Sequence, residues 1–149
     1  MKIINKHFFR DYEEIESFEA GISLLGGEVK QIKAHQLKLE TAYVKILNDG
    51  VYLINANIPN YQFSFPLGYD PTRSRKLLLH KHQILKLEMK MHKGNLTIAP
   101  KSCYTKGQLL KLEIALVRGR KDIEKKKLVK ARDVRLEQRK MLKDYMKGE

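Results

Sequence analysis

The side chains that could do chemistry in this sequence are mainly cations. Lysine and arginine account for 30 of the 149 residues and aspartate and glutamate for 17, which gives a formal net charge of +13. A surplus of this size attracts polyanions, because a bound polyanion releases its condensed counterions. Nucleic acid is therefore the first class of partner to consider, and an anionic membrane surface is the competing class.

The cations divide the chain into two parts. Residues 1–117 hold 17 basic and 11 acidic side chains, whereas residues 118–149 hold 13 basic and 6 acidic ones. Hydrophobic residues make up 42% of the chain, which is enough for a modest core. We predict a folded domain over residues 1–117 and a basic C-terminal tail over residues 118–149. The tail should be disordered alone and become helical on a phosphate-rich partner.

Residues for catalysis or metal binding form no clear site. Cys103 is the single cysteine, so it has no partner for a disulfide or a zinc site. His80 and His82 lie two positions apart on a segment expected to be helical, where they would not share a face. No nucleophile motif or glycine-rich phosphate loop is present. We expect no metal, no cofactor and no enzymatic activity, although a ribonuclease that uses a histidine and a lysine stays open.

Membrane and export signals are not indicated by the sequence. The N-terminal residues lack the apolar run of a signal peptide, and no stretch approaches the roughly 18 consecutive apolar residues of a spanning helix. We expect a cytoplasmic protein that does not enter a membrane.

The elements that must position these cations are mainly strands. Apolar and polar side chains alternate with a period of two, the pattern of a half-buried strand. Asp49-Gly50 supplies the positive φ values of a tight turn, so the runs on either side of it should pair as an antiparallel hairpin. The strands predicted in this way span residues 17–24, 42–47, 51–54, 96–98 and 110–117.

Two segments depart from the strand period. Residues 28–33 suit a short helix, and residues 75–91 carry an apolar stripe at helical spacing. Thr72 or Ser74 could cap the start of the longer helix, and Gly94 could end it. Short strands around a few helices predict a mainly β fold, a small antiparallel barrel whose closure removes exposed sheet edges.

Five separated groups of residues resemble one family. They are Phe18-Glu19-Ala20-Gly21-Ile22, Gly27-Glu28-Val29-Lys30, Asn55-Ala56-Asn57-Ile58, the run from Asp70 to His80, and Gly119-Arg120-Lys121 leading into Lys130-Ala131-Arg132-Asp133. In order and spacing, residues 5–135 resemble the SsrA-binding family of bacteria, the transfer-messenger RNA-binding proteins of trans-translation. The resemblance implies an oligonucleotide-binding-like antiparallel β-barrel with about three helices and a flexible basic tail.

The resemblance also implies a function. Members of this family bind the tRNA-like domain of transfer-messenger RNA (SsrA RNA) and deliver it to stalled ribosomes. The tail then occupies the empty mRNA channel and the decoding centre of the small subunit. Transfer-messenger RNA and the stalled ribosome are the implied partners, and elongation factor Tu on the charged RNA is a further one.

The RNA-facing residues are carried over position by position. Lysine and arginine would neutralise phosphates, carboxylate and amide groups would bond bases or ribose hydroxyls, and leucine would offer an apolar face to an unstacked base. The implied set is Glu19, Leu78, His80 and Lys111, with Glu28, Lys30, Asn55, Arg75 and Lys76 around it.

The ribosome-binding residues are carried over in the same way. Ile123 stands where the family usually has an aromatic or imidazole side chain, so apolar contact would replace stacking there. The implied tail set is Lys121, Ile123, Lys125, Lys126, Lys130, Arg132 and Arg135.

Plainer interpretations remain open at these positions. Glu28 and Lys30 could belong to an ordinary exposed helical turn, and Leu78 could be a core residue, since apolar stripes usually face inward. The tail lysines could serve solubility alone. The alternative function is a general rRNA-binding barrel that acts in ribosome assembly, with which the composition agrees equally well.

Overall fold

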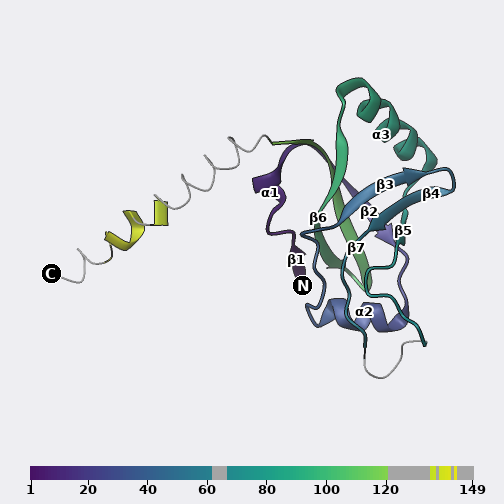
Figure 1. Ribbon diagram of the computed structural model, residues 1–149, viewed down its shortest axis with the longest axis horizontal. Coiled ribbons are helices and arrows are strands. Elements are labelled where there is room, and N and C mark those ends of the chain that lie inside the picture. Colours follow the sequence, from purple (N-terminus) through teal and green to yellow (C-terminus); the bar gives the residue numbers. More distant parts are fainter. Residues whose placement is uncertain (62–66, 121–134, 137, 142, 144–149) are drawn as a thin grey trace. The chain divides into compact units, whose positions relative to one another are not determined.

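Strands dominate the structure, and the connections between them carry the helices. The computed structural model describes residues 1–61, 67–120, 135, 136, 138–141 and 143 (Figure 1). Its contacts separate two units, Met1–Gly119 and Arg120–Glu149. The elements of the first unit are β1 (Lys2–Ile4), α1 (Phe8–Asp11), β2 (Tyr12–Ile22), α2 (Gly26–Lys33), β3 (Tyr43–Leu47), β4 (Gly50–Ile54), β5 (Arg75–Leu78), α3 (Lys81–Gly94), β6 (Thr97–Lys106) and β7 (Leu109–Gly119).

The strands form one antiparallel sheet whose pairings close into a ring. Their order is β1-β6-β3-β4-β5-β2-β7, and β6 also pairs with β7. β1 lies outside the ring, on the edge of β6. The predicted mainly β, antiparallel fold with a few helices is therefore confirmed. Figure 1 shows α2 and α3 at opposite ends of the sheet.

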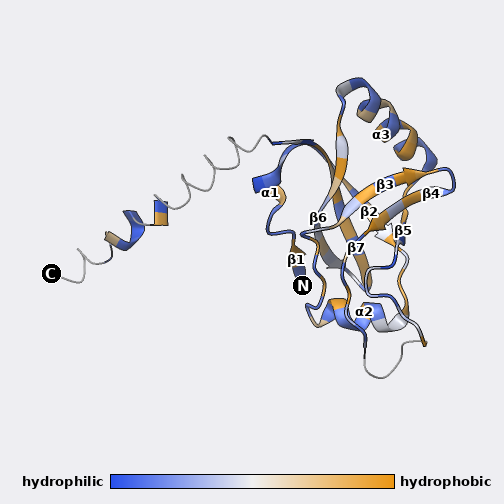
Figure 2. Cartoon of the chain, viewed as in Figure 1, coloured by the Kyte–Doolittle hydropathy of each residue, from blue (hydrophilic) through white to orange (hydrophobic). Residues whose placement is uncertain are grey.

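The core lies inside the ring, and the predicted alternation accounts for most of it. Every strand of the ring contributes buried apolar side chains, and Ile32 of α2 and Leu87 of α3 cover them. Strands β3 and β4 are mostly hydrophobic, whereas α3 carries both kinds of residue (Figure 2). Cys103 belongs to this core, and its burial raises the pKa of the thiol to about 11, so it packs as a small apolar group.

A second, smaller core lies beneath α1, and the sequence analysis did not anticipate it. Phe8 packs with Ala99, Ala115 and Val117, and Tyr12 adjoins them. Residues 110–117 were predicted to be half-buried. Ala115 and Val117 are nevertheless buried, because α1 covers the face that the alternation assigned to solvent. Neither α1 nor β1 was predicted, since each is too short to show a period.

The predicted helix over residues 75–91 is wrong in its first part. Residues 75–78 form β5, which pairs with β4 and β2, and the helix begins at Lys81 after the cap residue His80. The prediction that Thr72 or Ser74 caps this helix is therefore wrong. Arg75 and Leu77 are buried while Lys76 and Leu78 are exposed, the alternation of a strand. The leucine spacing of this segment suits a helix, but the pairing of β5 with β2 and β4, which closes the sheet, determines its structure instead.

The C-terminal end of α3 agrees with the sequence prediction, whereas β6 is longer than the strand predicted there. The helix α3 ends at Gly94, and Asn95 takes the left-handed conformation with φ 50°. The strand predicted over residues 96–98 continues as β6 to Lys106. Proline has no N–H to donate to a β-ladder. The register between β6 and β7 shifts between Pro100 and Ser102, and this bulge accommodates the proline within the strand.

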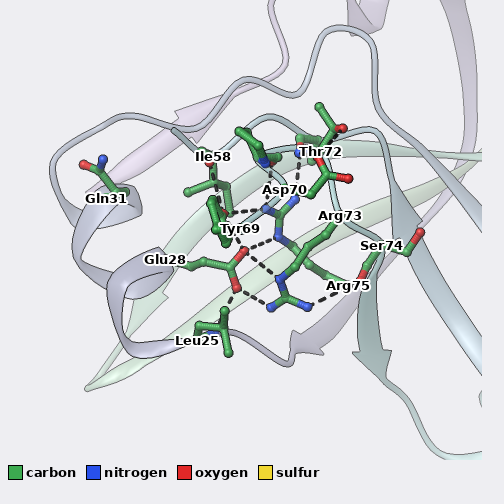
Figure 3. A network of polar contacts seen from close by, with 12 residues as sticks. Leu25, Glu28, Gln31, Ile58, Tyr69, Asp70, Thr72, Arg73, Ser74 and Arg75 are labelled. Carbon is green, nitrogen blue, oxygen red and sulfur yellow. Dashed lines mark hydrogen bonds and ion pairs between the residues drawn. The ribbon is translucent and has the colours of Figure 1, made fainter. Parts of the chain in front are cut away.

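A buried ion-pair network holds the connection that leads into β5 (Figure 3). Glu28 and Arg75 are both 0% exposed, and Nε of Arg75 donates to Oε2 of Glu28 at 2.6 Å. Arg75 also donates to the carbonyl oxygens of Ala56 (2.7 Å) and Pro71 (2.9 Å). Arg73 donates to both carboxylate oxygens of Glu28. The carboxylate of Glu28 therefore holds the end of the β4–β5 connection at Arg73 and Arg75, and Arg75 in turn ties this end to its start at Ala56.

The network also satisfies the remaining polar atoms of the site. Tyr69 donates to Oε2 of Glu28 at 2.9 Å, and the backbone N–H of Leu25 donates to Oε1 at 2.9 Å. Burial alone would raise the pKa of Glu28. The bonds from Arg73, Leu25 and Arg75 outweigh it and hold that pKa below its ordinary value of 4.5. The carboxylate therefore stays ionised in the folded protein.

We predict that Glu28→Gln destabilises the protein by about 3–5 kcal/mol at pH 7, because two guanidinium groups lose their counter-charge inside the fold. Urea denaturation followed by circular dichroism measures the difference. Glu88→Gln on α3 is the matched control and should stay within about 0.5 kcal/mol of the unchanged protein.

The same comparison has a defined pH dependence. The folded pKa of Glu28 lies below 4.5, so its stabilising effect is complete above pH 4.5 and is lost as the pH falls through the folded pKa. The gap between the unchanged protein and Glu28→Gln should shrink on acidification below pH 4.5. A gap that stays constant to pH 2.5 would contradict this account.

Candidate nucleic-acid interface

A groove on the outside of the ring brings five of the nine predicted RNA-facing residues together. Its walls come from β2, the turn between β3 and β4, β5, the start of α3, and β7. The predicted residues in it are Glu19, Lys76, Leu78, His80 and Lys111. The others that line it are Gly21, Asp49, Gly50, Val51, Leu77, Leu79, Gln83 and Ile84.

The alternation of β5 supplies the apolar side chain of the groove. Leu77 packs in the core at 2% exposure, and Leu78 points outward and is 57% exposed. The alternative of a core role for Leu78 therefore does not hold. Gly21 lies opposite Leu78 in the β2–β5 pairing, and a Cβ on Gly21 would lie only 3.1 Å from the Cβ of Leu78. The absence of a side chain at Gly21 lets Leu78 lie across β2.

The turn between β3 and β4 lies against the side chain of Lys76. Gly50 has φ 149°, and a Cβ there would lie 2.9 Å from Cε of Lys76. The lysine stem thus passes directly over the glycine, which leaves its ammonium group in the groove. Asp49 of the same turn accepts a bond from the hydroxyl of Tyr52 at 2.7 Å, which holds this carboxylate on its own hairpin.

The acidic residue of the groove is restrained by neighbours from β6. The hydroxyl of Tyr104 donates to Oε2 of Glu19, and Nζ of Lys106 lies 3.3 Å from Oε1. The bond from Tyr104 is the main reason that the pKa of Glu19 lies below its ordinary value, and Lys106 and Lys111 lower it further. Burial, and then the bond to Glu19, raise the pKa of Tyr104 to about 12. The tyrosine therefore keeps its proton, and Glu19 remains an oriented anion among cations.

His80 stands at the junction of β5 and α3. Its backbone N–H donates to Oε1 of Gln83 at 3.1 Å, which closes the first turn of the helix. Because His80 precedes the helix, its ring stacks on that of His82, with centroids 5.5 Å apart and planes inclined by 9°. The expectation that these rings would not share a face assumed a helix and is wrong. Among the described residues, no three metal-ligating side chains gather.

A groove with cations, an apolar side chain and oriented hydrogen-bonding groups has the chemistry to hold RNA. The model of the family "SmpB protein" matches residues 2–144 of the sequence. The chain belongs to the SmpB family.

Named relatives match the SmpB sequence over nearly its whole length. A protein of Mycoplasma mycoides called "SsrA-binding protein" is 42% identical over 142 residues, which are 95% of this chain and 94% of the relative. A protein of Mesoplasma florum with the same name is 44% identical over 143 residues, 95% of this chain and 94% of the relative. A third, from Persephonella marina, is 41% identical over 143 residues, 96% of this chain and 94% of the relative.

The SmpB fold also has a solved counterpart. A chain in the structure "tmRNA-SmpB: a journey to the center of the bacterial ribosome" is 34% identical, with a TM-score of 0.66. The alignment covers 81% of this chain and 85% of that chain.

Four of the predicted RNA-facing residues of this SmpB chain do not line the groove. Glu28 and Arg75 have no exposed surface, so here they support β5 from inside the fold. Lys30 extends from α2 with its Nζ 5.3 Å from the ring centroid of Tyr61. Asn55 is exposed in the left-handed conformation, and its amide donates to the carbonyl of Thr41 at 3.2 Å.

The predicted tail residues fall mostly outside the described part of the SmpB chain. Arg135 is described and is exposed in a helical conformation. The others, Lys121, Ile123, Lys125, Lys126, Lys130 and Arg132, lie outside the described residues.

The residues that the sequence analysis missed come from β6 and the hairpin turns. Tyr104 and Lys106 lie on a strand that was expected to end before Pro100. The turn Gly107 with φ 64°, directly before the alternation of residues 110–117, was the available signal for a β6–β7 hairpin. That hairpin would have placed Tyr104 opposite Lys111 on the predicted strand of residues 110–117.

We predict that Tyr104→Phe raises the pKa of Glu19 toward its ordinary value of 4.5, because the carboxylate loses its strongest hydrogen bond. An NMR pH titration of the carboxylate carbon measures this pKa. Tyr52→Phe removes a comparable hydroxyl from Asp49 and is the control, in which Glu19 should titrate as before. An unchanged titration of Glu19 in Tyr104→Phe would show that the bond does not orient the acid.

Proposed function

We propose that this chain binds the tRNA-like domain of transfer-messenger RNA and delivers that RNA to stalled ribosomes for trans-translation. The relatives are named for binding SsrA RNA, and the solved counterpart is described as tmRNA-SmpB in the bacterial ribosome. The role is that of a cytoplasmic RNA-binding adaptor without catalysis. In the described residues, no helix is both long and apolar enough to span a membrane.

The observation that carries the proposal is the convergence of the family's RNA-facing residues in one groove. Glu19, the neighbouring Leu78 and His80, and Lys111 come from three distant parts of the sequence, and four different elements or junctions present them in one groove. Lys76 and Lys111 can neutralise phosphates, and Leu78 can support an unstacked base. His80 and the restrained carboxylate of Glu19 supply directed hydrogen bonds, which a purely cationic surface would lack.

The tail has a separate part in the proposal. Residues 118–149 hold 13 basic and 6 acidic side chains, so an rRNA-lined channel would attract them strongly. We propose that the tail occupies the empty mRNA channel and the decoding centre, through Lys121, Ile123, Lys125, Lys126, Lys130, Arg132 and Arg135. Elongation factor Tu on the charged RNA is a further proposed partner.

The first test is a gel-shift titration at physiological salt. The protein should bind transfer-messenger RNA at least about tenfold more tightly than an ordinary tRNA or an rRNA fragment of similar length. Leu78→Ala should reduce this preference with little effect on stability, because Leu78 is exposed, whereas Leu85→Ala on α3 is the exposed control. Equal affinity for all three RNAs would remove the specific claim and favour a general rRNA-binding role in ribosome assembly.

The second test separates the two parts of the chain. A protein that ends at Gly119, the last residue of β7, should bind transfer-messenger RNA nearly as well as the full chain but fail to support tagging of stalled products. His80→Ala in the full chain should weaken RNA capture itself. Translation of a truncated message in a reconstituted system reports tagging. Loss of RNA affinity on truncation would contradict the division of roles.

A further inference from the structure

Lys111 of β7 stands beside a carboxylate with which it forms no ion pair. It lines the groove that also holds Glu19, here called the first groove to distinguish it from other hollows of the folded unit. Glu113 follows two positions later, and Leu112 between them packs in the core, so both charged side chains point to the outside of the ring. Their Cα atoms are about 7 Å apart at the rise of a strand, a span that a lysine and a glutamate can bridge. Among the described residues, Lys111 nevertheless has no carboxylate within ion-pair distance.

Glu113 also lies directly opposite a second acid. Its partner in the pairing of β2 with β7 is Glu19. Like charges at such a position repel each other, so each carboxylate needs a partner of its own. Tyr104 and Lys106 donate to Glu19. The partners of Glu113 therefore decide whether its carboxylate turns toward Lys111 or away from it.

Two successive residues of β6 hold Glu113. The hydroxyl of Ser102 donates to its Oε2 at 3.0 Å, and Nζ of Lys101 lies 3.6 Å from its Oε1. Successive residues of a regular strand face opposite sides, but the bulge between Pro100 and Ser102 brings both side chains to one carboxylate. The bulge therefore gives Glu113 a cation other than Lys111.

Lys101 is itself held in place by its surroundings. Its Nζ donates to both carboxylate oxygens of Glu14, at 3.0 and 3.1 Å, and lies 5.4 Å from the ring centroid of Phe9 on α1. Burial alone would lower the pKa of Lys101. The bond to Glu14 and the charges of Glu113 and Glu14 outweigh burial and raise that pKa above its ordinary value of 10.5. Lys101 therefore remains a charged partner of both acids.

We propose that Lys101 is a positioning residue for RNA binding, because it holds Glu113 away from Lys111 and so leaves Lys111 for a phosphate. Without Lys101, the carboxylate of Glu113 would be free to turn along β7 and pair with Lys111. A phosphate of the RNA would then have to compete with a carboxylate of the protein. This inference rests on the proposed function and adds to it a residue that acts without touching RNA.

The test compares two double variants of the full chain that keep the net charge of the unchanged protein. Lys101→Met with Glu113→Gln removes the lysine together with the acid that it restrains. Lys101→Met with Glu14→Gln removes the lysine together with its other acid, so that Glu113 is left without a lysine. The side chains of Glu14 and Glu113 are 25% and 23% exposed, so the two doubles leave similar carboxylates behind and should be equally stable. Urea denaturation checks this.

Affinity for transfer-messenger RNA is measured by gel shift at several salt concentrations. The double with Glu113→Gln should bind within about twofold of the unchanged protein, because Lys111 keeps its phosphate contact. The double with Glu14→Gln should lose about fivefold at physiological salt, and its slope of log affinity against log salt should become shallower by about 0.7–0.9, the effect of one lost phosphate contact. Lys101→Met alone should show the same loss.

Lys90→Met is the control for the loss of one charge. It removes a half-buried lysine from Glu16 of β2, which does not line the first groove, and affinity should stay within about twofold of the unchanged protein. A loss equal to that of Lys101→Met would show that net charge alone lowers the affinity and would overturn the proposal.

The proposal is also overturned if the double with Glu113→Gln binds no better than the double with Glu14→Gln, because Glu113 then does not compete for Lys111. Failure of the proposed function has a different outcome. The unchanged protein would then show no preference for transfer-messenger RNA over an ordinary tRNA, while the two doubles would still differ in affinity and in salt slope on either RNA.

Discussion

The ion pair between Arg75 and Glu28 is the constraint on which the first groove depends. Arg75 begins β5 and is enclosed by α2 and by the connection from Ala56 to Pro71. Since alternate residues of a strand face opposite sides, the inward direction of Arg75 sets the outward direction of Lys76 and Leu78. A shift of β5 by one residue would bury the lysine and expose the arginine. The buried charge therefore fixes the register of the side chains that line the first groove.

Charge pairing distinguishes cations that support the fold from cations that are left for a ligand. Arg73, Arg75 and Lys101 all contact carboxylates and are buried or half-buried. Lys76 of the first groove has no ion pair among the described residues and is exposed. The net charge of the sequence predicts a polyanion but not this division, because pairing depends on side chains that meet only in the folded chain.

Local patterns predicted the elements that have a clear period and missed those that do not. The alternation of residues 17–24 and the Asp49-Gly50 turn led to the right strands and hairpin, and a family resemblance supplied the groove residues. The strand β5 was mistaken for helix because its four residues continue the leucine spacing of α3. Tyr104 was missed because Pro100 suggested a strand end, whereas a bulge carries β6 past it. Both errors concern long-range pairing, which no short window of sequence contains.

The pairing of β2 with β7 has a consequence for synthesis of the protein. Gly21 and Lys111 are neighbours in the sheet, although they lie near opposite ends of the sequence of the folded unit. During synthesis on the ribosome, β2 is made long before β7, so β2 cannot form its pairing with β7 until β7 has also been synthesised. The first groove is thus incomplete on every nascent chain that lacks Lys111, so a ligand of this groove can be captured only after β7 has been made.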